Sequence, residues 1–150
     1  MAYLIIDGKE YQARTDFKFE RAANEKYNEA DAEGNKQGGL ITIYSNLLEY
    51  DVLYLSAFWD CALAHLKADK PSLDSIDNAI TDHIEEHSDA DQLFKDAFSK
   101  LDQSGFFKKK VKKFWKNADM VKSLLTTDQE MKSYDQMLED MKEARKELTL

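Results

Sequence analysis

Apolar side chains recur at helical spacing along most of this 150-residue chain, and this periodicity limits the folds it can adopt. Two neighbouring stripes predict core helices: Leu40, Ile43, Tyr44, Leu47 and Leu48, then Leu55, Phe58, Trp59, Ala62, Leu63 and Leu66. Spacings of three and four residues place such side chains on one side of a helix, which must then pack against another element. The chain is therefore expected to be mostly helical.

The strand signal lies at the amino end. Two short runs with β-forming residues flank Asp7-Gly8, and this dipeptide suits the two positive φ angles of a type I′ turn. The sequence thus predicts a β-hairpin. Because an isolated hairpin is only marginally stable in water, we expect it to be covered by the next helix, which Thr15 or Asp16 can cap.

Further helices follow the two core stripes. Ser72 can cap a helix that starts after Pro71, and Thr127 and Glu130 stand at the spacing of a capping box. The remaining apolar stripes are Leu73, Ile76, Ile80 and Ile84; Phe94, Ala97, Phe98 and Leu101; Phe107, Val111, Phe114, Ala118, Val121 and Leu125; and Met131, Tyr134, Leu138, Met141 and Leu148. The predicted fold class is α+β, mostly α. An N-terminal β-hairpin packs on a bundle of about five to six helices, with an amphipathic C-terminal helical arm.

Charge divides the chain into two parts. Residues 1–105 carry 10 basic and 21 acidic side chains, net −11, whereas residues 106–150 carry 11 basic and 8 acidic, net +3. We therefore expect an acidic α+β core domain at 1–105 and a basic, amphipathic helical region at 106–150. The overall net charge of −8 argues against nucleic acid as the partner of the whole protein.

Lysines alternate with aromatic residues at the start of the second region. Residues 106–118 contain six lysines and no acid, whereas residues 72–94 contain seven acids and no base. The basic segment could bind an acidic protein surface, an anionic membrane surface or a nucleic-acid strand. We favour an acidic protein surface, in the same chain or another copy, because residues 74–91 offer a complement.

Catalytic and metal-binding motifs are weak. His83 and His87 match the H-x-x-E-H pattern of zinc peptidases and share one side of a helix, but no third ligand is apparent. We interpret them as bordering a packed face, which leaves a small zinc hydrolase as a remote hypothesis. The single cysteine, Cys61, is expected in the core. The sequence predicts no enzyme, no metal site and no cofactor.

A membrane location is not expected either. The most apolar stretch is interrupted by Glu49, Asp51 and Asp60, each costing roughly 2.5 to 3.5 kcal/mol at a bilayer centre. One cysteine cannot form an internal disulfide, and the first residues lack the pattern of a signal peptide. We therefore expect a cytoplasmic setting.

Several short segments, read together, carry a family resemblance. They are Leu4-Ile5-Ile6-Asp7-Gly8-Lys9-Glu10-Tyr11, Phe17-Lys18-Phe19, the loop ending Gly38-Gly39-Leu40, and Lys70-Pro71-Ser72-Leu73 before an acidic helix. In this order they resemble the tail assembly chaperones of long-tailed, siphovirus-type phages of Gram-positive bacteria. The resemblance covers roughly residues 3–125 and leaves the final helix unmatched.

The resemblance implies a non-catalytic protein of the host cytoplasm that is absent from the mature virion. Such chaperones bind the tape measure protein, keep it soluble and help tail tube protein assemble around it. We expect an adaptable apolar surface for this task, and methionines are concentrated in the last third of the chain. The hypothesised contact residues are Phe107, Phe114, Trp115, Met131, Tyr134, Leu138 and Met141.

Two further possibilities stay open. Several copies could pair through the same apolar stripes and form a homo-oligomer before a client arrives. The alternative function is a nucleic-acid-associated regulatory protein that uses the lysine-rich helix 106–118.

Overall fold

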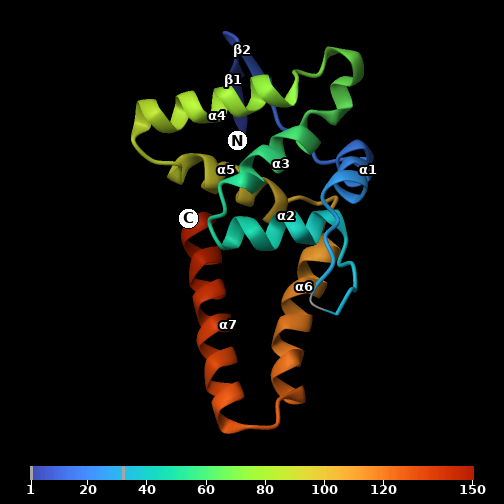
Figure 1. The fold of residues 1–150 in the computed structure, drawn as a ribbon, viewed down its shortest axis with the longest axis vertical. Helices are drawn as coiled ribbons and strands as arrows, with labels where there is room; N and C mark the ends of the chain where they lie inside the picture. Colours follow the sequence, from blue (N-terminus) through green and yellow to red (C-terminus); the bar gives the residue numbers. More distant parts are fainter. Residues whose placement is uncertain (1, 32) are drawn as a thin grey trace.

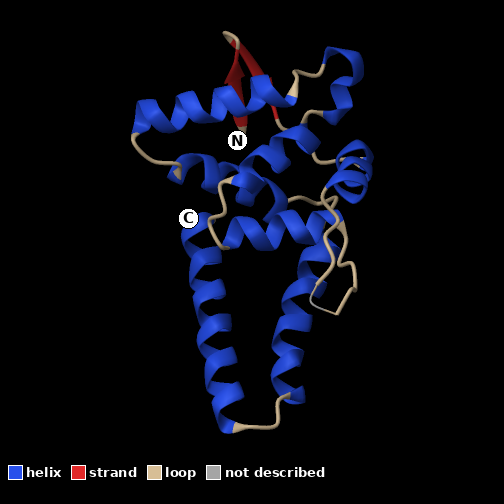
Figure 2. Ribbon diagram, viewed as in Figure 1, coloured by secondary structure: helices blue, strands red, loops and turns tan. Residues whose placement is uncertain are grey.

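The computed structural model describes residues 2–31 and 33–150 (Figure 1). Helices make up most of it, and a two-stranded sheet lies at one end (Figure 2). The described elements are β1 (Tyr3–Ile6), β2 (Lys9–Gln12), α1 (Phe17–Lys26), α2 (Gly39–Leu48), α3 (Leu53–Ala62), η1 (Ala64–Asp69), α4 (Leu73–His87), α5 (Asp91–Asp102), α6 (Lys108–Val121), η2 (Lys122–Leu124) and α7 (Asp128–Leu148). This architecture confirms the predicted α+β, mostly α class.

The hairpin forms where the Asp-Gly dipeptide predicts it. Asp7 and Gly8 have φ angles of 51° and 80°, and β1 pairs antiparallel with β2. Leu4 and Ile6 are buried, whereas the alternate residues Tyr3 and Ile5 are half exposed. The buried side of β1 packs on α4, not on α1 as expected from the sequence. The helix that covers the hairpin is thus more than 60 residues away in the sequence.

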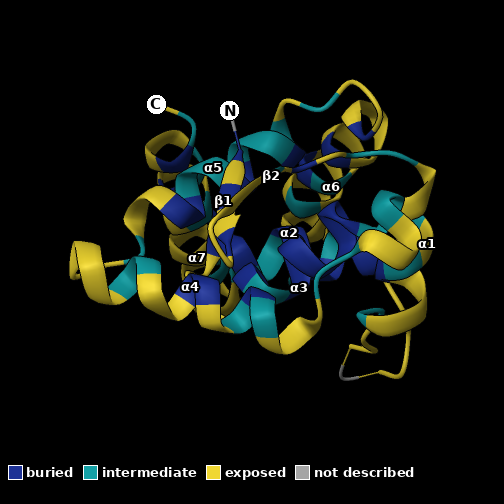
Figure 3. Ribbon diagram, turned by 90° about the horizontal axis from the view of Figure 1, so that it is seen from above, coloured by how far each residue is buried: buried dark blue, intermediate teal, exposed yellow. Residues whose placement is uncertain are grey.

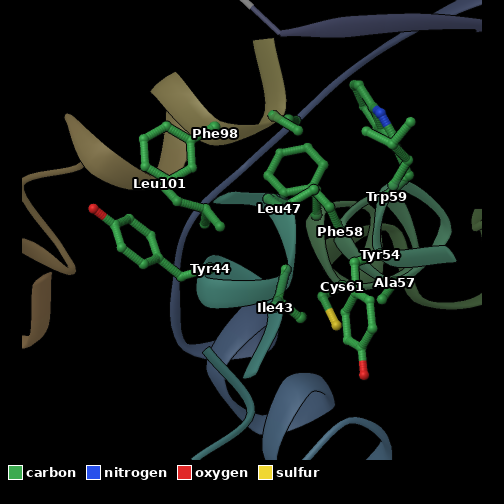
Figure 4. Packing of buried hydrophobic residues seen from close by; sticks show 14 of the residues in the cluster. Ile43, Tyr44, Leu47, Tyr54, Ala57, Phe58, Trp59, Cys61, Phe98 and Leu101 are labelled. Carbon is green, nitrogen blue, oxygen red and sulfur yellow. The ribbon is translucent and has the colours of Figure 1, made fainter. Parts of the chain in front are cut away.

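Helices α2 and α3 form the centre of the core. Ile43, Leu47, Leu55 and Phe58 are fully buried, and Figure 4 shows Leu47 and Phe58 between α2 and α3, with Phe98 of α5 nearby. Seen from above, the buried parts of the ribbon gather on these central helices (Figure 3). The two predicted core stripes are confirmed. Only the end of the second differs, because α3 stops at Ala62 and the chain continues as a 3₁₀ helix.

A buried carboxylate joins α1, α3 and the chain after η1. Asp60 accepts hydrogen bonds from the Tyr27 hydroxyl at 2.7 Å and from Lys26 Nζ at 3.2 Å, and Lys70 Nζ lies 2.5 Å from its other oxygen. Burial alone would raise the pKa of Asp60. The hydrogen bonds from Lys70, Tyr27 and Lys26, together with the positive charge of Lys70, outweigh burial and hold that pKa below its ordinary value.

The last two helices extend away from the core as a helical hairpin (Figure 1). α6 begins on the core, where Val111 and Trp115 are buried, and α7 returns to α5. The Ser99 hydroxyl donates to the Leu148 carbonyl at 2.8 Å and fastens the end of α7. The Glu130 backbone N–H donates to the Thr127 hydroxyl at 3.1 Å, so the predicted N-cap of α7 is confirmed.

Candidate partner-binding groove

An apolar groove opens between the two diverging helices. Its volume is about 560 Å³. α6 and α7 form its walls, and the first turn of α2 closes its inner end. The lining residues are Gln37, Gly38, Leu40, Ile41, Lys110, Lys113, Phe114, Asn117, Ala118, Val121, Tyr134, Met137 and Met141.

A polar network joins α2, α5, α6 and α7 at the inner end of the groove. The Tyr44 hydroxyl of α2 donates to Asp102 Oδ1 at 2.6 Å and accepts a hydrogen bond from Trp115 Nε1 at 2.7 Å. Arg145 of α7 donates from Nε to the same Asp102 oxygen at 3.1 Å and lies over the Trp115 ring at 4.9 Å. Burial, together with the hydrogen bond to Asp102, raises the pKa of Tyr44. One carboxylate of α5 thus ties α2 and α7 together, and α6 joins them through Tyr44.

We predict that Asp102→Ala lowers the free energy of unfolding by about 2–4 kcal/mol, because it leaves a half-buried guanidinium and a buried hydroxyl without their acceptor. Urea denaturation measures this loss. Asp102→Asn retains an acceptor oxygen and should cost less. A change below about 0.5 kcal/mol in the alanine variant, the range of a neutral surface substitution, would contradict the role of this network.

Weak polar contacts hold the outer half of the hairpin. Lys122 Nζ lies 2.7 Å from Asp135, and Lys142 Nζ lies 3.1 Å from Asp119. These exposed ion pairs contribute about 0–1 kcal/mol each. The Tyr134 hydroxyl also donates to the Ala118 carbonyl, and burial raises the pKa of that hydroxyl. These contacts are polar links between the outer parts of α6 and α7.

The structure divides the seven hypothesised contact residues. Phe114, Tyr134 and Met141 line the groove and are partly buried. Met131 is partly exposed but does not line it. Phe107, Trp115 and Leu138 are only 2%, 8% and 7% exposed, and belong to the chain's own core. Phe107 and Trp115 are buried because the apolar side of α6 packs on the body of the protein, and Leu138 is buried on α7.

Several lining residues were not anticipated as contacts. Val121 belongs to one of the predicted packed stripes, and Ile41 belongs to none of them. Met137 is 47% exposed and stands three residues after Tyr134 and four before Met141. That helical spacing is a signal in the sequence that could have identified Met137 as part of the same surface.

The lysine-rich segment does not dock on the acidic helix of the same chain. α4 lies at the opposite end of the molecule from the outer half of α6 (Figure 1). Lys110 instead forms an ion pair with Glu20 of α1. Within residues 2–31 and 33–150, the five other lysines of α6 have no acidic partner: Lys108, Lys109, Lys112, Lys113 and Lys116. The expectation that the basic segment docks on the acidic residues 74–91 of the same chain is therefore wrong.

The sequence offered the His83–His87 pair and Cys61 as candidate reactive residues. The rings of His83 and His87 stack with centroids 4.0 Å apart, and burial, followed by the charge of His87, lowers the pKa of His83. Among the described residues, no group of three or more His, Cys, Asp or Glu side chains is placed to hold a metal.

Burial raises the pKa of the Cys61 thiol to about 12, so this thiol stays protonated at neutral pH. No helix in the described part of the chain is long and apolar enough to cross a bilayer.

The hairpin, the helical core and the groove define a small, mostly helical protein with an apolar hollow between its last two helices. The family model described as phage tail assembly chaperone protein, TAC, matches residues 3–116. The chain belongs to this phage tail assembly chaperone family, as the resemblance predicted. No curated protein and no solved structure gives a significant match. Membership indicates a role in tail assembly and suggests that this role is not enzymatic.

Proposed function

We propose that this protein binds the tape measure protein of a long-tailed phage of Gram-positive bacteria and keeps it soluble. It then promotes assembly of tail tube protein around that client and leaves before the virion is complete. Its place of action would be the cytoplasm of the infected host cell. Family membership supports the tail-assembly part of this proposal.

The groove between α6 and α7 is the observation that carries the proposal. Its walls present Phe114, Tyr134, Met137 and Met141 from two helices. Covering apolar surface of a client stabilises the complex by about 25 cal/mol per Å². Methionine side chains are flexible and polarizable, so they can adapt to more than one client sequence.

Self-association is a second use of the same surface. A client-free groove leaves apolar side chains open to water, and another copy could cover them. Such a homo-oligomer would compete with the client for Phe114, Met137 and Met141. Light scattering of the protein with and without client would report the exchange as a change in molar mass.

We predict that Met137→Glu reduces the amount of soluble tape measure protein about tenfold or more on co-expression, because an unpaired charge would have to be buried against the client. The measurement is the client's soluble fraction after centrifugation. The side chain is half exposed, so the variant should fold normally, as circular dichroism would check.

Leu124→Glu is the matched control. Leu124 is 77% exposed and lies in η2, outside the groove lining. Leu124→Glu introduces the same charge into the same helical hairpin and should leave the client's soluble fraction unchanged. Equal rescue by wild type and a folded Met137→Glu variant would contradict a client contact in this groove.

A further inference from the structure

We infer that the groove selects an amphipathic helix whose apolar stripe is bordered on one side by acidic side chains. This inference rests on the proposed function, because it describes the chemistry of the client segment held in the same groove. It is carried by the helical walls of the groove and by the unpaired charge along one of its edges.

The walls favour a helical partner over an extended one. Their lining residues come from α2, α6 and α7 and from two residues that precede α2. The sheet edge in the described chain belongs to the β1–β2 hairpin, which lies beside α4 and away from the groove (Figure 1). An extended segment would thus find no strand to pair with. A helix can instead place its side chains between those of α6 and α7, as packed helices do.

The length of the groove suits a few turns of helix. Its lining residues on α6 run from Lys110 to Val121, which is about 16 Å at 1.5 Å per residue. A partner helix covers that distance in about three turns. Its apolar side chains at i, i+3 or i+4, and i+7 would then meet Phe114, Met137 and Met141.

One edge of the groove carries unpaired positive charge. Lys113 lines the groove itself, and a second hollow of about 490 Å³ next to it is lined by Lys109, Lys112, Lys113, Lys116, Asn117 and Met120. The four lysines are exposed and stand at spacings that gather them along α6. None of the four has an acidic partner within the described residues. Their mutual repulsion would be relieved by carboxylates on a docked helix.

On the opposite wall, α7 places no charged side chain among the residues that line the groove. On α7, Asp135 is already paired with Lys122, and Lys142 with Asp119. The side chains that α7 turns toward the groove are Tyr134, Met137 and Met141. The partner therefore needs acidic residues along the edge that meets α6.

Nucleic acid fits these lysines less well than an acidic helix. Single strands bind by stacking bases on exposed aromatic rings beside basic side chains. Phe107 and Trp115 are buried, Phe114 is half-buried against Tyr44, and Phe106 packs edge-on against Phe17 at 4.9 Å. Phe106 is 44% exposed but precedes α6, and within α6 itself no aromatic ring is exposed beside the lysines.

The test uses overlapping 25-residue peptides that cover the tape measure protein, with the full-length chain as the binding protein. We expect the bound peptides to be amphipathic helices with acidic residues on one border of the apolar stripe. Lys113→Glu/Lys116→Glu should lower the affinity for these peptides about tenfold at low salt. The difference in affinity between this variant and wild type should shrink at 0.5 M NaCl because salt screens exposed charges.

Lys132→Glu/Lys146→Glu is the matched control, because it makes the same charge change on exposed positions of α7. It should leave the bound set and the affinities unchanged. Bound peptides without an acidic border, or equal losses in both double variants, would overturn the charge preference. So would competition by a 20-base single-stranded DNA at physiological salt. The proposed function would survive those results if Met137→Glu still abolished binding, and it would fail if no peptide bound in a Met137-dependent manner.

Discussion

Gly39→Ala is expected to lower the free energy of unfolding by about 3 kcal/mol or more. A Cβ atom at this position would stand 2.0 Å from the carbonyl carbon and oxygen of Ala23 and 2.6 Å from the backbone nitrogen of Asn24. Both neighbours are backbone atoms of α1, so relief requires the two helices to separate. Urea or thermal denaturation of the purified variant would measure the loss.

The effect should also reach the groove. Gly39 is the first residue of α2, and its N–H donates to Asn24 Oδ1 at 2.8 Å. Leu40 and Ile41, the next two residues, form the inner end of the groove. If α2 shifts away from α1, the groove changes shape, and client binding should fall with stability.

Gly105→Ala provides the control for this prediction. A Cβ atom at Gly105 would meet no atom within 4 Å, and the residue has no left-handed φ angle. This variant should change stability by no more than about 0.5 kcal/mol. A stability loss in Gly39→Ala no greater than that of Gly105→Ala would contradict the close contact between α1 and α2.

Asp60→Ala is expected to cost about 3–5 kcal/mol, the range for breaking a buried ion pair by removing one partner. Asp60 is 2% exposed, and its removal takes away the carboxylate that Lys70, Lys26 and the Tyr27 hydroxyl share. Chemical denaturation would measure the loss. Asp60→Asn keeps an acceptor for Tyr27, so its free energy of unfolding should lie between those of wild type and the alanine variant. A loss below about 1 kcal/mol in Asp60→Ala, small for such a pair, would show that the cluster contributes little.

The same pair gives a dependence on pH. Because the pKa of Asp60 is lower in the folded protein than its ordinary value of 3.8, the unfolded chain binds the proton more readily. The stability from this carboxylate is therefore complete above the ordinary pKa and is lost as the pH falls through the lower, folded value. Denaturation from pH 6 to pH 2 should show the difference between wild type and Asp60→Asn shrinking below about pH 4.

Local patterns were sufficient for the secondary structure. Asp7-Gly8 predicted the turn, Asp16, Ser72 and Thr127 predicted caps that the structure contains, and the stripe around Ile43 predicted α2. Each of these features depends on residues within a few positions of one another. Such short-range relations can be read from a single sequence.

The contact surface needed information of longer range. Phe107 and Trp115 have the same amphipathic spacing as Phe114, yet only Phe114 lines the groove. Which of them is buried depends on how α6 meets α1 and α2, and spacing within α6 does not contain that information. For the same reason the sequence did not reveal the Asp60 cluster, whose partners lie 34 and 33 residues upstream at Lys26 and Tyr27.

The sequence alone determined the helical class, the N-terminal hairpin, the charge division and the family. These depend on composition, on periodicity and on motifs close together in the chain. The tertiary structure decided that α4 covers the hairpin, that Asp102 ties α7 to α2, and that α6 and α7 diverge to leave a groove. These outcomes arise from contacts between segments far apart in the chain, where side-chain shape and hydrogen-bond geometry select one packing among several that the same stripes allow.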